Sequence, residues 1–104
     1  METVYNFNCS KTKIIEQLVD NDEVMINHII LNRGEALPEH NSNSNVYLII
    51  IRGTLFIKLA DKQTKQYKAG SIINVPYDIK MNISNNNEEQ LEFFVIKAPS
   101  PRMI

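Results

Sequence analysis

The chain consists of short segments rich in β-branched and aromatic residues, separated by Gly, Pro, Asn or Asp. Ile, Val, Tyr and Phe favour pleated surfaces, and segments of this length are typical of strands. Six segments have this form, at residues 24–31, 46–51, 54–59, 71–75, 79–83 and 91–97. Consecutive strands with no helix between them can bury their apolar faces only on one another. The sequence therefore predicts an all-β barrel or sandwich.

A chain of 104 residues has the length of one domain. We expect residues 1–104 to form a single domain, with a barrel over residues 23–98 and an N-terminal segment over residues 1–22. Within that segment, residues 12–19 fit either a short helix or a strand that contacts a second subunit. Lysines near its start would oppose the dipole of a helix, which favours the strand.

Charge and composition exclude several classes of function. Eleven Lys and Arg residues are scattered among twelve Asp and Glu residues, so no basic patch suits nucleic acid or an anionic membrane. The longest apolar run, residues 46–51, is too short to span a bilayer, and no apolar leader follows Met1. Cys9 is the single cysteine, cannot form an intrachain disulfide, and is interpreted as a bystander thiol. These features predict a cytoplasmic protein.

Two stretches rich in Asn and Ser, residues 41–45 and 85–87, are typical of exposed loops and turns. Asn and Ser side chains hydrogen-bond the neighbouring backbone and so favour turns over strands. We therefore expect neither stretch to form a functional site.

Residues 46–51 are apolar on both faces of the expected strand. The side chains at every second position from Val46 point to one face and can fill the barrel. Those at every second position from Tyr47 point to the other face and need a separate cover. A second subunit would provide that cover in a homodimer. The alternative is a cover from the same chain, such as residues 12–19. We expect the homodimer.

Two motifs resemble the signature motifs of the cupin superfamily, whose members fold as small jelly-roll β-barrels. The first is GEALPEHNSNSNVYLIIIRG, from Gly34 to Gly53, and the second is GSIINVPYDIKMNISN, from Gly70 to Asn85. The resemblance implies a single-domain, cupin-type jelly-roll barrel. Asp78 stands where the family has a Gly, and Asp tolerates the left-handed conformation better than most residues.

The same resemblance implies where a metal would bind. The four ligand positions of the family converge inside the barrel, and here they hold His40, Ser42, Val46 and Met81. An imidazole, a hydroxyl, an alkyl group and a thioether lack at least two of the strong donors that a divalent cation needs. We therefore expect no metal and no other cofactor. The alternative is a shifted ligand set of His40, Asp78 and an Asn amide.

The ligand pocket is expected at His40, Ser42, Val46, Tyr47, Leu48 and Met81. The side chains of the pocket can fill it as part of the hydrophobic core, which Met81 favours because Met packs well into irregular gaps. Alternatively, the pocket can stay open for a small molecule. His40 is the one candidate catalytic base, with Tyr47 or Ser42 as proton partner, but no acid stands at the matched positions. We interpret His28 as a partly buried or interfacial residue, because apolar residues alternate with it.

These features favour a metal-free cupin barrel that acts as a small-molecule binding or regulatory module over an enzyme. Two alternatives stay open. One is a metal-independent, isomerase-like cupin that uses His40 as a base. The other is a metallocupin dioxygenase or isomerase with the shifted ligand set.

Overall fold

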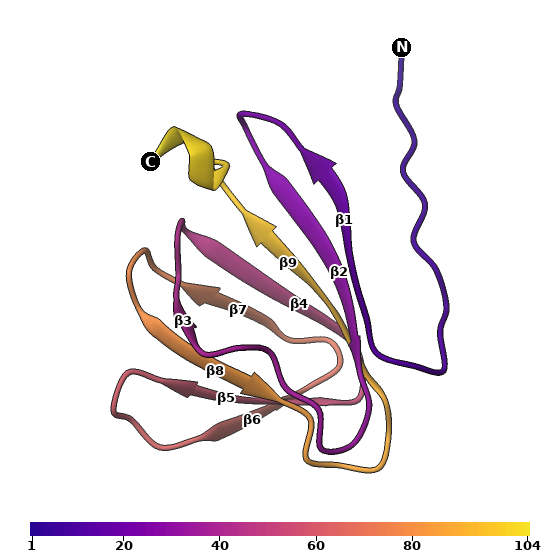
Figure 1. Ribbon diagram of the computed structural model, residues 1–104, viewed down its shortest axis with the longest axis vertical. Helices are drawn as coiled ribbons and strands as arrows, with labels where there is room; N and C mark the ends of the chain where they lie inside the picture. The colour runs from indigo at the N-terminus through magenta and orange to yellow at the C-terminus, as the bar shows by residue number, and fades with distance from the viewer.

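The computed structural model describes residues 1–104 and contains nine β-strands and one short 3₁₀ helix. The strands form two facing antiparallel sheets (Figure 1). The five-stranded sheet has the order β1-β2-β9-β4-β7, and the four-stranded sheet has the order β3-β8-β5-β6. The chain crosses repeatedly between the two sheets, so that β9 lies between β2 and β4, as in a jelly roll.

The five-stranded sheet consists of β1 (Ile14–Asp20), β2 (Met25–Leu31), β9 (Leu91–Lys97), β4 (Val46–Arg52) and β7 (Ile72–Val75). The four-stranded sheet consists of β3 (His40–Asn41), β8 (Lys80–Ser84), β5 (Thr54–Leu59) and β6 (Lys65–Lys68). The 3₁₀ helix, Pro101–Met103, follows β9. No helix of the structure is long and apolar enough to cross a membrane.

One core of 13 buried hydrophobic residues lies between the sheets. Alternation along each strand supplies it: Leu48 from β4 and Phe93 from β9 are both fully buried, and Leu55 from β5 faces them from the other sheet. Burying one such side chain contributes about 1.5–3 kcal/mol. The prediction that the set beginning with Val46 fills the barrel is confirmed.

All six predicted strands are present, with ends that differ from the prediction by at most one residue. Segment 12–19 forms most of β1, so the strand interpretation is confirmed over the helix. The sequence analysis missed β3 and β6. The first has only two residues, and the second is an edge strand, Lys-Gln-Tyr-Lys, whose polar side chains carry no apolar alternation.

The two Asn-rich stretches are not simply exposed loops, and that expectation is wrong at three positions. Ser42, Ser44 and Asn85 are at most 2% exposed. The Asn85 Nδ2 donates to the Leu31 carbonyl at 2.9 Å, and the Ser44 Oγ donates to the Pro99 carbonyl at 2.5 Å. Small polar side chains thus hold these loops against the barrel, while the neighbouring asparagines face solvent.

Candidate functional site

A cavity of about 150 Å³ lies between the two sheets beside β3. Seven apolar side chains form most of its wall, among them Leu48 and Met81. Because β3 has only two residues, the chain just before it completes the wall with Leu37 and Pro38. The sequence left open whether the core fills this space; in the structure the space is not completely filled, and it has room for a small molecule.

Three polar residues line the same cavity: Asn27 from β2, His40 from β3 and Lys97 from β9. His40 is exposed at the mouth, and its Nδ1 lies 2.8 Å from the Pro38 carbonyl oxygen. A carbonyl can only accept, so Nδ1 carries a proton and donates it. In the neutral ring, Nε2 is then left as a hydrogen-bond acceptor.

Ser42 does not line the cavity. Its Oγ donates to the Pro76 carbonyl oxygen at 2.5 Å and accepts from the Ile79 N–H at 2.8 Å. The side chain is 2% exposed, so both hydrogen bonds are shielded from water. Ser42 therefore joins the segment after β3 to the turn between β7 and β8, and its hydroxyl has no free role in chemistry.

The residues at the four family ligand positions do not fit a divalent metal. Val46 is fully buried and Met81 is 3% exposed, and both belong to the hydrophobic core. The Ser42 hydroxyl already holds two backbone groups. No group of three or more His, Cys, Asp or Glu residues is placed to hold a metal ion. His40 alone supplies a strong donor, which is far fewer than such an ion needs.

The shifted ligand set does not converge either. His40 and Asn41 are adjacent in β3, so their side chains point to opposite faces of the strand. The Asn41 Nδ2 donates to the Asp78 Oδ1 at 2.9 Å, away from the cavity that His40 lines. Asp78 has φ +62°, the left-handed conformation that its place in the motif requires.

Tyr47 lies on the wrong side of the sheet for a pocket residue, and its assignment to the pocket needs correction. Its neighbours Val46 and Leu48 point into the barrel, so the two-residue period of β4 turns Tyr47 to the outer face, where it is 38% exposed. Of the six expected pocket residues, the structure brings His40, Leu48 and Met81 together at the cavity.

Sequence analysis missed Asn27 and Lys97. The Asn27 Oδ1 atom is buried and has no hydrogen-bond partner. Lys97 is partly buried, and burial lowers the pKa of its ammonium group from the usual 10.5. A signal was present: Leu91, Phe93 and Val95 alternate along β9, and the same period places Lys97 inside the barrel.

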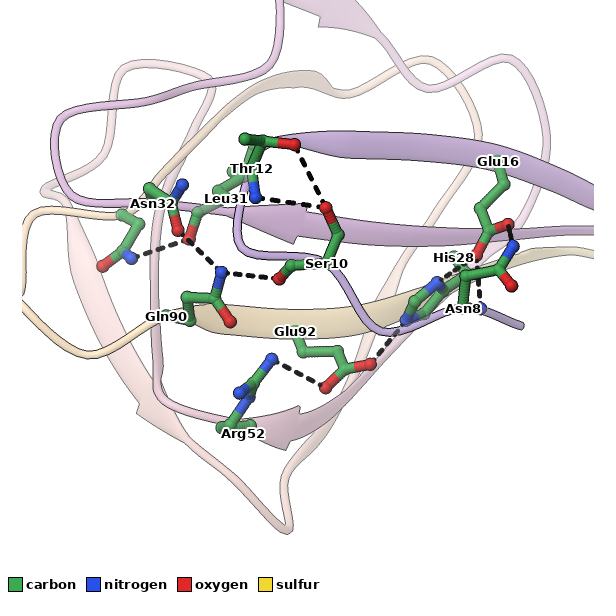
Figure 2. Close-up of polar contacts among 11 residues, drawn as sticks. Asn8, Ser10, Thr12, Glu16, His28, Leu31, Asn32, Arg52, Gln90 and Glu92 are labelled. Carbon is green, nitrogen blue, oxygen red and sulfur yellow. Dashed lines mark hydrogen bonds and ion pairs between the residues drawn. The ribbon is translucent and has the colours of Figure 1, made fainter.

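A second polar cluster lies on the outer face of the five-stranded sheet (Figure 2). The His28 side chain is fully buried between two carboxylates, with its Nδ1 2.8 Å from the Glu16 Oε1 and its Nε2 2.6 Å from the Glu92 Oε2. The Arg52 Nη2 lies 3.1 Å from the Glu92 Oε1. The ring thus ties β1 to β9 across β2.

The N-terminal segment covers this cluster. The backbone N–H of Asn8 donates to the Glu16 Oε1 at 2.9 Å (Figure 2). The Phe7 ring centre lies 4.9 Å from those of His28 and Phe94. The Asn8 N–H is the largest cause of the lowered pKa of Glu16, and the His28 hydrogen bond lowers it further. His28 is therefore a buried structural residue with no access to a ligand.

Two facing antiparallel sheets with a cavity between them define a double-stranded β-helix of the cupin type. No family model matches the chain. The chain is 50% identical, over 105 aligned residues, to an uncharacterized protein of Methanocaldococcus jannaschii, and the match covers 100% of this chain and 90% of the relative. A crystal structure from the same organism, described as an RmlC-like cupin family protein with a double-stranded β-helix fold, superposes with a TM-score of 0.95. It is 50% identical, and the match covers 98% of this chain and 94% of that one. The chain belongs to the RmlC-like cupin family.

Solved structures of lower identity share the fold. A cupin superfamily protein of Desulfitobacterium hafniense is 17% identical with a TM-score of 0.76, and the match covers 89% of this chain and 83% of that one. A conserved Klebsiella pneumoniae protein with a double-stranded β-helix domain is 15% identical with a TM-score of 0.79, and the match covers 92% and 84%. The cupin resemblance of the two sequence motifs is confirmed.

Proposed function

We propose that the protein is a metal-independent cupin barrel that binds one small organic molecule between its sheets and acts as a binding or regulatory module. The cavity of about 150 Å³ is the observation that carries this proposal. Concave, mostly apolar sites with a few convergent polar groups are the usual form of small-molecule sites. The poor donor set at the family ligand positions supports binding without a metal.

The geometry gives the enzyme alternatives less support. A base at His40 needs an acid that returns a proton to the substrate. Tyr47 lies on the outer face of the sheet, and the Ser42 hydroxyl is buried in two backbone hydrogen bonds. Neither expected proton partner reaches the cavity, so ligand binding is the function that the arrangement favours.

A thermal-shift screen of small organic molecules, paired with elemental analysis of the untagged protein, tests this function. A ligand at about 100 times its dissociation constant stabilises the folded state by about 2.7 kcal/mol. We expect some compounds to stabilise the native protein but not Leu48→Phe, whose larger side chain fills the cavity. Ile104→Phe enlarges an exposed side chain that does not line the cavity and is the matched control. Metal near one equivalent per chain, or ligand binding that survives Leu48→Phe, would contradict the proposal.

The outer face of the five-stranded sheet is the part of the molecule that we assign to self-association. Ile72 is 65% exposed there, Ile51 is 42% exposed and Tyr47 is 38% exposed. The N-terminal segment adds Val4 and Tyr5, which are 73% and 52% exposed. Apolar side chains on both the face and the segment favour a second copy as the partner, with Val4 and Tyr5 of each copy lying over the sheet of the other.

Sedimentation velocity tests the homodimer. We expect the native protein to sediment as a dimer and Ile72→Lys to sediment as a monomer, because the change buries a charge in the interface. Tyr77→Lys is the matched control, since Tyr77 is 57% exposed but lies in the turn after β7. A monomeric native protein, or an Ile72→Lys variant that stays dimeric, would refute the interface.

A further inference from the structure

We propose that the molecule bound in the cavity is a small organic anion, a compact carboxylate that also carries a hydroxyl group, with Lys97 holding the carboxylate and Asn27 accepting from the hydroxyl. This inference rests on the proposed function, because it names the class of ligand for the same cavity. A volume of about 150 Å³ matches that of a cavity that holds benzene. The ligand therefore has about six to eight non-hydrogen atoms.

Charge is the first argument. Lys97 is the one charged residue that lines the cavity, and no Asp or Glu lines it. Lys97 takes part in none of the ion pairs of the structure. Lys97 is partly buried against the apolar wall of the cavity, and this burial lowers the pKa of its amine. An unpaired, partly desolvated ammonium beside an apolar wall attracts an anion in place of the missing carboxylate.

The location of Lys97 is the second argument. In the pairing of β4 with β9, Lys97 lies directly opposite Val46. Val46 occupies the position at which the cupin motif has its carboxylate ligand. With Val46 in place of a carboxylate, the neighbouring Lys97 ammonium disfavours a metal ion and favours the binding of an anion.

Asn27 supplies the third argument. Its Oδ1 is buried without a partner, and a buried acceptor left unpaired costs about 1–3 kcal/mol. Asn27 pairs with Val95, while Lys97 pairs with Met25, so Asn27 and Lys97 are diagonal neighbours on adjacent strands. Such neighbours have Cβ atoms about 7 Å apart. One ligand can therefore place a carboxylate at the ammonium, and its hydroxyl reaches the amide oxygen once the Asn27 amide turns toward the cavity.

His40 faces the other two polar residues from the opposite sheet. Its Nδ1 is held by the Pro38 carbonyl, so its Nε2 is the ring atom left for a ligand. In the neutral ring, Nε2 can accept a hydrogen bond from a second hydroxyl of the ligand or from a bridging water. In the protonated ring, the imidazolium adds to the positive charge of the cavity. Both states favour an oxygen-rich, anionic molecule over a hydrocarbon.

Four probes of seven non-hydrogen atoms each separate the contributions of charge and hydroxyl. They are 2-hydroxyisobutyrate, pivalate, which replaces the hydroxyl by a methyl, 2-hydroxyisobutyramide, which is neutral, and pinacolone, which lacks both features. Chemical-shift titration of the native protein measures each dissociation constant. We expect 2-hydroxyisobutyrate to bind at least tenfold more tightly than its amide and about tenfold more tightly than pivalate.

Two variants connect these preferences to residues. Lys97→Met keeps the length of the side chain and removes the charge, so we expect it to lose the preference for carboxylate over amide. Lys58→Met, at an exposed position of β5, is the matched control and should keep that preference. Asn27→Leu should reverse the preference between 2-hydroxyisobutyrate and pivalate.

The outcomes distinguish the two proposals. Equal binding of 2-hydroxyisobutyrate and its amide to the native protein overturns the anion assignment and leaves the binding cavity in place. A tenfold preference that persists in Lys97→Met also overturns it. If the probes bind but Leu48→Phe leaves their affinities unchanged, the cavity is not the site, and the proposed function fails with the anion.

Discussion

The imidazole of His28 and the carboxylate of Glu92 are joined by a contact of 2.6 Å between Nε2 and Oε2, on the outer face of the sheet. Neither group is freely exposed: the His28 side chain is 0% exposed and that of Glu92 is 13% exposed. The second ring nitrogen of His28 faces Glu16. Three side chains from β1, β2 and β9 thus form one network with the imidazole at its centre (Figure 2).

Removing that ring should destabilise the protein strongly. We expect His28→Leu to lower the free energy of unfolding by about 3 kcal/mol, because it removes the buried donor that lies between two partly buried carboxylates. Glu16 then keeps only Asn8 as a partner, and Glu92 keeps only Arg52. Urea unfolding followed by circular dichroism measures the loss. Glu88→Gln is the control, since the Arg33–Glu88 pair is 65% and 87% exposed and its loss should not be measurable. Similar losses in the two variants would show that the buried network contributes nothing special.

Acid should release the N-terminal segment. The pKa of Glu16 is lowered, chiefly by the backbone N–H of Asn8. A carboxyl whose folded pKa lies below its unfolded value stabilises the fold above that unfolded value, and this stabilisation is lost as the pH falls through the folded pKa. We expect the Asn8 amide to lose its protection from hydrogen exchange in that acidic range. In Glu16→Gln, protection that still changed with pH over the same range would contradict this prediction.

The strand pattern and the fold could be predicted from the sequence because both depend on local features. Alternation of apolar residues places Val46 inside and Tyr47 outside, and Gly34, Gly53 and Gly70 mark the motif frame. The polar groups of the cavity depend instead on which strands become neighbours. Lys97 lies next to Val46 only because β9 pairs with β4, some fifty residues away along the chain.

The same limit applies to the outer cluster. Glu16, His28 and Glu92 come from segments far apart in sequence, and their meeting follows from the β1-β2-β9 order. The apolar residues that alternate with His28 indicated that it is partly buried, but no nearby residue in the sequence identified Glu16 and Glu92 as its partners. The motif frame indicated His40, which lines the cavity, but gave no signal for Asn27, which the cupin motifs do not include.

Alkaline pH should favour the fold through Lys97. Its folded pKa is lowered by burial, so the unfolded chain binds more protons between that value and 10.5, and stability rises with pH there. We expect Lys97→Met to be more stable than the native protein at neutral pH. The difference in urea midpoint should shrink as the pH rises through the lowered pKa. His40 is the only other titratable residue that lines the cavity, and it is present in both proteins. A difference independent of pH would contradict the prediction.

Gly53, in the turn between β4 and β5, should not tolerate a side chain. Its φ is +81°, and an added Cβ would lie 2.3 Å from the Gln90 carbonyl oxygen. We expect Gly53→Ala to cost about 3 kcal/mol, from the left-handed conformation and the backbone contact together. Gly70→Ala is the matched control: its φ is +95°, but nothing lies within 4 Å of the added Cβ, so only the conformational cost of about 1 kcal/mol applies. Equal losses would show that the backbone moves away from Gly53 freely.

Asn85 should contribute far more to stability than its neighbour in the same loop. Its Nδ2 donates to the carbonyls of Leu31 and Glu89, both at 2.9 Å, and its Oδ1 accepts from the Asn87 N–H at 3.0 Å. The residue is fully buried, so Asn85→Ala leaves three backbone groups without this partner. We expect a loss of about 2–3 kcal/mol in urea unfolding. Asn86→Ala, at an exposed position, should change stability by less than about 0.5 kcal/mol. A comparable effect of the two substitutions would mean that water replaces the Asn85 amide without cost.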